Sequence, residues 1–199
     1  MPKPPRSIAA FTLVELLIGM AIIAIIVTLA VPSFRDMILM QRLRGVNAQL
    51  VTDISFARAE AVSRASFVQV RFQNIIGSAG MSCYIIHTRT NMGLNTLCDC
   101  TAAEGSRCLD PTAATEIRTV QLPNTQSVFV MPAAASTYTI DPRTGGMMMP
   151  GLDGPAAPNE SMVIDTLIDS ARKFRNLVAQ SGRVSVCQPL GSRVGGVSC

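Results

Sequence analysis

Residues 11–31 read FTLVELLIGMAIIAIIVTLAV, and this stretch decides the fold of the chain. It is apolar around every face of a helix and about as long as a helix needs to be to span a bilayer. Glu15 is its one charged residue. Because a charge within the bilayer costs about 3 kcal/mol on insertion scales, we expect a membrane helix in which this carboxylate has a partner and a task.

A short basic leader, residues 1–10, precedes the apolar run; it carries Lys3 and Arg6 and ends in small residues. Together with Phe11 and Glu15, this leader resembles the class III signal of type IV prepilins and type II secretion pseudopilins. An ordinary secretory signal fits less well, because its cut lies beyond the apolar part. An ordinary signal anchor that carries a Glu is the remaining alternative.

The resemblance implies that a membrane peptidase cuts between Ala10 and Phe11 and that the new amine is methylated. It also implies that Glu15 pairs with the amine of a neighbouring subunit. An opposite charge lowers the cost of burying Glu15 among apolar helices, and so sets the axial register of the subunits. The family usually has Gly before the cut, but Ala10 is small enough to pass the same steric filter.

The 199-residue chain is long enough for one ordinary domain beside a long helix. Its formal net charge of +4 falls to +2 without the leader, with 15 basic residues against 13 acidic ones, so bulk charge gives no strong case for nucleic acid. Nearly all the basic residues are Arg, which suits bidentate contact with carboxylate or phosphate. Six Cys in a chain that crosses to an oxidising compartment indicate disulfides rather than metal ligands.

Beyond Pro32, which removes a helical hydrogen bond and kinks the axis, the pattern becomes amphipathic. Apolar residues recur at spacings of three and four, at Leu43, Val46, Leu50, Ile54, Ala57 and Ala61. Polar residues fall on the other faces, at Arg42, Gln49, Asp53 and Arg64. The spacing predicts one helix from Phe11 to about Arg64 whose second half packs one face against a globular domain.

After residue 65 the pattern is typical of β structure, with short runs of β-branched and aromatic residues between turn signals. The predicted strands are 67–72, 83–87, 116–122, 128–131, 137–140, 162–168, 173–178 and 183–187. Residues 91–110 predict a polar loop pinned by a disulfide, and 141–146 a turn. We expect Met147, Met148 and Met149 to be exposed loop residues, with a subunit contact as the alternative, followed by an exposed segment to residue 160.

These elements predict an α+β chain with the type IV pilin fold. A long N-terminal helix, with a transmembrane half and an amphipathic half, packs on a C-terminal antiparallel β domain. The expected parts are a leader peptide at 1–10, a transmembrane and assembly helix at 11–31, the amphipathic half at 32–65 and the globular β domain at 66–199.

The C-terminal pattern of strand, Ser-Gly-Arg turn, strand and Cys, within residues 171–187, resembles the end of the GspH/FimT family. Some FimT proteins bind DNA through a Gly-Arg-x-Arg motif there; Gly182 and Arg183 match it, but Ser185 replaces the second Arg. Since phosphate contacts depend on charge more than on exact sequence, other cations could complete a basic patch: Arg172, Lys173, Arg175 and Arg193. The favoured interpretation is that Arg183 ends a strand and that the others are solvated charges at a sheet edge.

The cysteines and the single histidine allow a second interpretation, a zinc site made by Cys98, Cys100, Cys108 and His87. Its spacing matches no common structural pattern, and disulfides are favoured. A bond between Cys187 and Cys199 would close a small Gly-rich loop, a familiar device in pilin C-terminal regions; the pairing of the other four, Cys83 included, cannot be deduced. The chain shows no Ser-His-Asp set, paired acids or phosphate loop, so we expect no enzyme, no cofactor and no metal, and a structural His87.

The resemblance implies a minor pilin of a bacterial type IV pilus that helps to prime or cap the filament. The implied partners are other minor and major pilins, the prepilin peptidase and the inner-membrane assembly platform, with weak DNA binding at most. The chain would cross the inner membrane once, with its globular domain in the periplasm, before it joins the pilus at the cell surface. Three alternatives stay open: a DNA-binding minor pilin for natural transformation, a type II secretion minor pseudopilin, and a monotopic binding protein that never polymerises.

Overall fold

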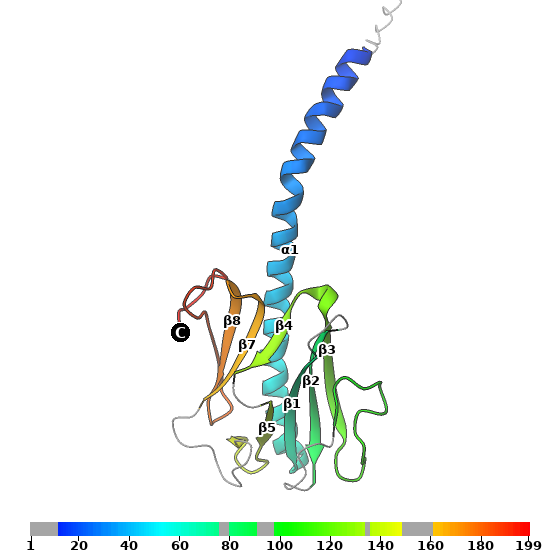
Figure 1. The fold of residues 1–199 in the computed structure, drawn as a ribbon. Coiled ribbons are helices and arrows are strands. Elements are labelled where there is room, and N and C mark those ends of the chain that lie inside the picture. The colour runs from blue at the N-terminus through cyan, green and yellow to red at the C-terminus, as the bar shows by residue number, and fades with distance from the viewer. Residues whose placement is uncertain (1–11, 76–79, 91–97, 134–135, 149–160) are drawn as a thin grey trace, which may run out of the picture. The chain divides into compact units, whose positions relative to one another are not determined.

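The computed structural model describes residues 12–75, 80–90, 98–133, 136–148 and 161–199 (Figure 1). A single long helix, α1 (Leu13–Arg64), comes first, and all the strands follow it. By its internal contacts the chain divides into two compact units, Met1–Leu39 and Met40–Cys199, so the boundary between them lies within α1.

Helix α1 agrees with the predicted span at its C-terminal end and continues through Pro32. It ends where Ala65 adopts a left-handed conformation with a φ of 49°. The amide of Ser66 then donates to the carbonyl oxygen of Ala61 at 3.3 Å, a closure that satisfies one of the carbonyl groups left free at a helix end.

The strands form two antiparallel sheets within the second unit (Figure 1). The first has the order β3-β2-β1-β5-β6, made of β1 (Phe67–Ile75), β2 (Met81–Arg89), β3 (Glu116–Pro123), β5 (Thr137–Ile140) and β6 (Met147–Met148). The second has the order β4-β7-β8-β9, made of β4 (Phe129–Pro132), β7 (Met162–Asp169), β8 (Arg172–Val178) and β9 (Val184–Cys187). A short 3-10 helix, η1 (Asn124–Gln126), leads from the first sheet into the second.

Each predicted strand is present, with its ends shifted by three residues at most, but β6 was not predicted. The expectation that Met147 is an exposed loop residue is wrong, because its side chain is only 5% exposed and belongs to the core. The turn at 141–146 explains the difference: it folds β6 back onto β5, where Met147 pairs with Ile140. Met148 is half-buried, whereas Met149 and the segment to residue 160 lie outside the described residues.

The core of the second unit lies between the C-terminal half of α1 and the two sheets. All of the apolar helix residues predicted to face the domain are buried there: Leu43, Val46, Leu50, Ile54, Ala57 and Ala61. The strands add a cluster of aromatic rings, in which Phe72 lies 5.6 Å from Tyr84 and 6.0 Å from Tyr138 between ring centroids. The amphipathic face predicted from the spacing is therefore confirmed.

One polar residue on the helix departs from the expected pattern. Asp53 was placed on a solvent-facing side, but it is 1% exposed. Its carboxylate accepts a hydrogen bond from the Tyr84 hydroxyl at 2.7 Å and forms an ion pair with Arg118 at 2.8 Å. Partners from β2 and β3 thus draw this carboxylate under the first sheet, which sequence spacing alone could not show.

Candidate functional site

The N-terminal part of α1 presents its apolar side chains to the outside. Large hydrophobic residues from Leu13 to Ile38 are exposed, and within the described part of the chain α1 is the one helix long and apolar enough to cross a membrane. Exposure of this extent marks a surface that is covered by lipid or by other helices. The segment is therefore built for an apolar environment rather than for water.

Glu15 lies in the first turn of α1, and its side chain is exposed. Its amide donates to the hydroxyl of Thr12 at 3.3 Å, so Thr12 caps the helix N-terminus. A carboxylate in the first turn also interacts favourably with the helix dipole. The Thr-x-x-Glu spacing of a capping box was present in the sequence and could have located this helix start. The predicted cleavage residues Ala10 and Phe11 lie outside the described residues.

The cations proposed as a DNA-binding patch do not gather in one place. Arg172 pairs with Asp169 at 2.7 Å, and Nε and Nη2 of Arg175 donate to the two carboxylate oxygens of Asp165, at 2.8 and 2.9 Å. The hydrogen bond from Arg172 is the main influence that holds the pKa of Asp169 below its usual value. Two of the proposed phosphate contacts are therefore occupied by carboxylates of the same sheet.

The remaining three cations lie at opposite ends of β8. Lys173 is near the start of β8, and the amide of the exposed Arg193 donates to the carbonyl oxygen of Ala171 beside it, at 2.7 Å. Arg183 is exposed in the turn after the far end of β8, about 20 Å away at the rise of a strand. Its neighbour Gly182 packs against Gly145 of the 141–146 turn and against Arg58 of α1, which was not among the predicted site residues.

The cysteines form three disulfides, which leave no free thiol within the chain: Cys83–Cys100, Cys98–Cys108 and Cys187–Cys199. The third is the bond that the resemblance implied. The described residues contain no cluster of three or more His, Cys, Asp or Glu that could hold a metal ion. The cysteines of the imagined zinc site are consumed by two of these bonds, which join the 98–108 loop to itself and to β2.

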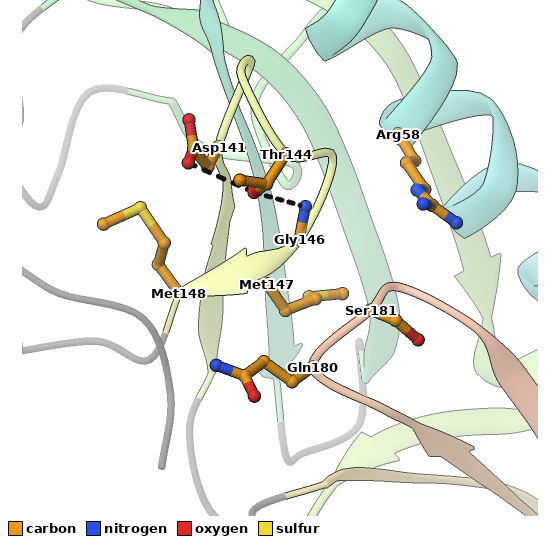
Figure 2. A pocket seen from close by; sticks show the side chains of 8 residues that line it. All are labelled: Arg58, Asp141, Thr144, Gly146, Met147, Met148, Gln180 and Ser181. Carbon is orange, nitrogen blue, oxygen red and sulfur yellow. Dashed lines mark hydrogen bonds between the residues drawn. The ribbon is translucent and has the colours of Figure 1, made fainter. Parts of the chain in front are cut away.

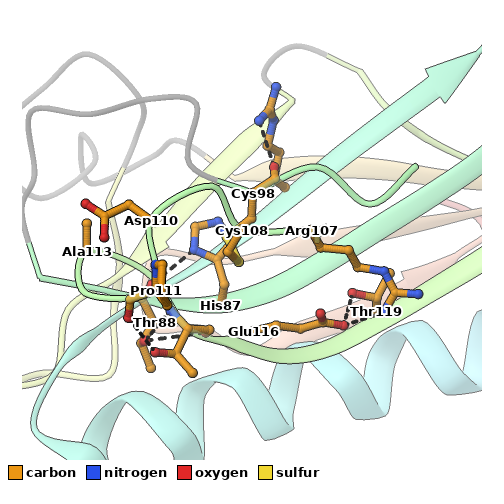
Figure 3. The surroundings of a disulfide bond; sticks show 12 residues. His87, Thr88, Cys98, Arg107, Cys108, Asp110, Pro111, Ala113, Glu116 and Thr119 are labelled. Atoms are coloured by element: carbon orange, nitrogen blue, oxygen red, sulfur yellow. Dashed lines mark hydrogen bonds and ion pairs between the residues drawn. A yellow bond between two sulfur atoms is a disulfide. The ribbon is translucent and has the colours of Figure 1, made fainter. Parts of the chain in front are cut away.

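His87 lies next to the Cys98–Cys108 bond and is fully buried (Figure 3). Its Nδ1 donates to the carbonyl oxygen of Thr88 at 3.1 Å, and among the described residues its Nε2 has no hydrogen-bond partner. Burial lowers the pKa of His87 to about 4, aided by the positive charges of Arg89 and Arg71. A neutral, enclosed imidazole fits the structural role predicted for it.

An apolar N-terminal helix with one carboxylate in its first turn, continued by an amphipathic half that packs on antiparallel sheets, defines the class of type IV pilin-like proteins. The prokaryotic N-terminal methylation motif matches residues 5–31. The family described as type II transport protein GspH matches residues 47–193, which is well over half of the chain. The chain belongs to the GspH family.

Solved structures of the type IV minor pilin FimU from Pseudomonas aeruginosa are similar to this chain. One crystal form shares 15% sequence identity with a TM-score of 0.45, and the match covers 72% of this chain and 87% of that chain. A second crystal form shares 14% identity with a TM-score of 0.43, over 72% of this chain and 90% of that one. No curated protein matches the sequence at a significant level.

Proposed function

We propose that this protein is a minor pilin of a bacterial type IV pilus, an assembly subunit that helps to prime or cap the filament. The observation that carries the proposal is Glu15, a single carboxylate in the first turn of an exposed apolar helix. Membership of the GspH family and the N-terminal methylation motif support it.

The proposed mechanism begins with removal of residues 1–10 between Ala10 and Phe11. The new amine at Phe11 carries a positive charge close to Glu15 of a neighbouring subunit as helices come together. The pairing lowers the free-energy cost of burying the carboxylate among apolar side chains. The two charges meet only when the neighbouring subunits are shifted along the filament axis by one particular distance. Glu15 thereby sets the register in which this subunit enters a filament.

The proposed location follows from the same helix. Residues 11–31 anchor the chain in the inner membrane once, residues 32–65 continue as the amphipathic half, and the domain from residue 66 folds in the periplasm. The proposed partners are other minor and major pilins, the prepilin peptidase and the inner-membrane assembly platform. This role is structural and requires no catalytic group, cofactor or metal.

A minor pseudopilin of type II secretion is the second candidate, and the family description, a type II transport protein, favours it. Both roles use the same processed helix and the same carboxylate. They differ in the machine that is assembled, so deletion of the gene separates them. Loss of surface pili with intact secretion supports the pilus role, and the opposite pattern supports the secretion role.

The test of the proposal compares wild type, Glu15→Val and the apolar control Leu16→Val in the full chain. Glu15→Val makes the segment more apolar, so membrane insertion should be retained. Entry into sheared pilus fractions should fall sharply for Glu15→Val and stay near wild type for Leu16→Val. Mass spectrometry of the membrane-extracted protein should find a methylated N-terminus at Phe11.

Two outcomes contradict the proposal. If Glu15→Val enters the sheared fraction as well as wild type, the register role of the carboxylate is wrong. If the extracted protein still begins at Met1, the chain is not processed as a pilin, and a monotopic protein that never polymerises becomes the better description.

A further inference from the structure

Arg58 of α1 is enclosed by two glycine turns that belong to different sheets. Gly145 closes the turn between β5 and β6 with a φ of +64°, and Gly182 closes the turn between β8 and β9 with a φ of +77°. A Cβ at Gly145 would lie 2.9 Å from Nε of Arg58, and a Cβ at Gly182 would lie 3.0 Å from its Cδ. Both turns therefore require Gly to let the Arg58 side chain pass between them.

The two turns also hold each other in place. The amide of Met147 donates to the carbonyl oxygen of Gln180 at 2.8 Å, which joins the start of β6 to the loop after β8. A Cβ at Gly182 would lie 3.0 Å from the carbonyl oxygen of Gly145, so the backbones are in direct contact. The position of Arg58 is thus fixed by both sheets.

The guanidinium of Arg58 has no hydrogen bond or ion pair with any residue in the part of the chain that the structure describes. Asp141 lines the same cavity, but its carboxylate oxygens are used within its own turn (Figure 2). They accept hydrogen bonds from the amide of Arg143 at 2.9 Å and from the hydroxyl of Thr144 at 3.1 Å. Arg58 is therefore a half-buried, permanently charged group that lines the cavity and forms no ion pair within the described residues, although the carboxylate of Asp141 belongs to the same lining.

The cavity beside Arg58 has a volume of about 420 Å³ (Figure 2). Its walls combine apolar and polar surface: Met147 and Met148 supply thioether side chains, and Ser181 supplies a hydroxyl. Two more guanidinium groups, those of Arg143 and Arg183, are exposed on the two turns and likewise have no side-chain partner among the described residues. The local charge therefore favours an anion, and the walls favour one with a short apolar body.

We propose that this cavity binds a glutamate side chain from an acidic segment of a neighbouring subunit, with its carboxylate on the guanidinium of Arg58. The planar fork of Arg matches a carboxylate in bidentate geometry, and the methylene groups of Glu fit against Met147 and Met148. The inference rests on the proposed function only for the source of the segment, because the filament role places other subunits beside this domain.

A protein carboxylate fits this site better than a nucleic acid does. A nucleic-acid backbone is bound by cations spread along a track, together with aromatic side chains on which bases stack. Here the described lining of the cavity contributes one guanidinium, that of Arg58, and contains no aromatic residue.

The test titrates the full chain in detergent micelles with a blocked tripeptide, acetyl-Gly-Glu-Gly-amide, and with its neutral counterpart acetyl-Gly-Gln-Gly-amide. Nitrogen-resolved NMR follows Nε–Hε of Arg58 and the amides of Gly145 and Gly182. Inorganic phosphate and a ten-nucleotide single-stranded DNA form the remaining arms. Arg58→Gln removes the charge, Arg58→Lys keeps a charge and an aliphatic stem but not the planar fork, and Arg193→Gln is a matched control beside the start of β8, at the opposite end from Gly182.

We expect saturable shifts with the Glu peptide at millimolar concentration and at least about tenfold weaker binding of the Gln peptide, as for loss of a charged hydrogen bond. Binding should be lost in Arg58→Gln, weakened in Arg58→Lys and unchanged in Arg193→Gln. Equal binding of both peptides, or shifts that persist in both Arg58 variants, would overturn the proposal. Tighter binding of phosphate or of the oligonucleotide at the same residues would overturn it too. Because the measurement uses the isolated chain, its failure leaves the filament role of Glu15 untouched.

Discussion

Acidification should destabilise the domain through one buried group, the imidazole of His87. The side chain is fully buried, and its pKa is lowered from 6.5 to about 4, chiefly by burial. The hydrogen bond to Thr88 acts in the opposite direction but is outweighed, and Arg89 and Arg71 disfavour a further positive charge. The folded domain therefore keeps His87 neutral at a pH where the unfolded chain is protonated.

The sign and size of the effect follow from proton linkage. Above pH 6.5 the imidazole is neutral in both states, so its contribution to stability is complete. Between pH 6.5 and about 4 the unfolded chain binds a proton that the folded domain does not, and stability falls by about 1.4 kcal/mol per pH unit. The total loss of about 3 kcal/mol at pH 4 is a large part of the 5–15 kcal/mol that stabilises a typical domain.

The assay is urea unfolding of the oxidised Met40–Cys199 unit, followed by far-ultraviolet circular dichroism. It is repeated at several pH values from about 7.5 to about 4, which covers the interval in which the unfolded chain is protonated and the folded domain is not. His87→Leu keeps a buried apolar side chain and removes the titrating group. Subtracting the free energy of unfolding of the variant from that of the wild type cancels the contributions of the other titrating residues. These include Asp53, whose pKa is raised mainly by burial. Because the chain has a single His, its ring signal in NMR spectra of untagged protein reports this residue alone. Parallel stability curves, or a folded-state titration near pH 6.5, would refute the reasoning.

Three further predictions concern other parts of the domain. Replacing Cys83 and Cys100 with Ala should lower the free energy of unfolding by about 3 kcal/mol, because the bond closes a loop of 17 residues; a thermal melt unchanged by full reduction would contradict this. Gly182→Ala should lower the free energy of unfolding by about 1–3 kcal/mol, because of its positive φ and its contact with Gly145. The loss should exceed that of the control Gly105→Ala, where φ is also positive but a Cβ meets nothing within 4 Å. Equal losses in urea unfolding would contradict the packing argument. In gel-shift titrations, wild type should bind DNA weakly at physiological salt, Ser185→Arg should bind more tightly, and Arg183→Gln should change little; tight binding that collapses in Arg183→Gln would favour the DNA-uptake role.

The helix and most strands could be predicted because their signals are local. The spacing of Leu43, Val46 and Leu50 marks the buried face wherever the sheets lie, and the alternation in 67–72 marks a strand whatever its partner. Asp53 and Met147 were assigned to the wrong surroundings for the opposite reason. Their burial depends on partners in β2, β3 and β5, which are distant in sequence or reached only through a turn.

In the candidate site, too, features set by local sequence could be predicted and features set by distant contacts could not. The position of Glu15 in the first helical turn could be predicted from the neighbouring residues, and the Cys187–Cys199 bond was implied by the resemblance to pilin C-terminal regions. The environment of Arg58 could not be predicted, because it is formed by two turns from different sheets. The sequence of each turn predicts the turn itself but not the turn that packs against it. The separation of Arg183 from Arg172 could not be predicted either, because it depends on which end of β8 each residue adjoins.

The contact between Asn47 and Asn176 has a consequence for the order in which the chain folds. The side-chain amide of Asn176 on β8 donates to the oxygen of Asn47 on α1 at 2.8 Å, and both side chains are buried although 129 residues separate them. Such distant pairings form late, because the intervening chain must be brought together before they stabilise anything. The part of α1 around Asn47 is thus synthesised early and lacks its partner until β8 of the second sheet is in place. A chain truncated before β8 would keep an intact membrane segment while leaving the Asn47 amide without its partner, so incomplete copies would remain anchored yet open to proteases.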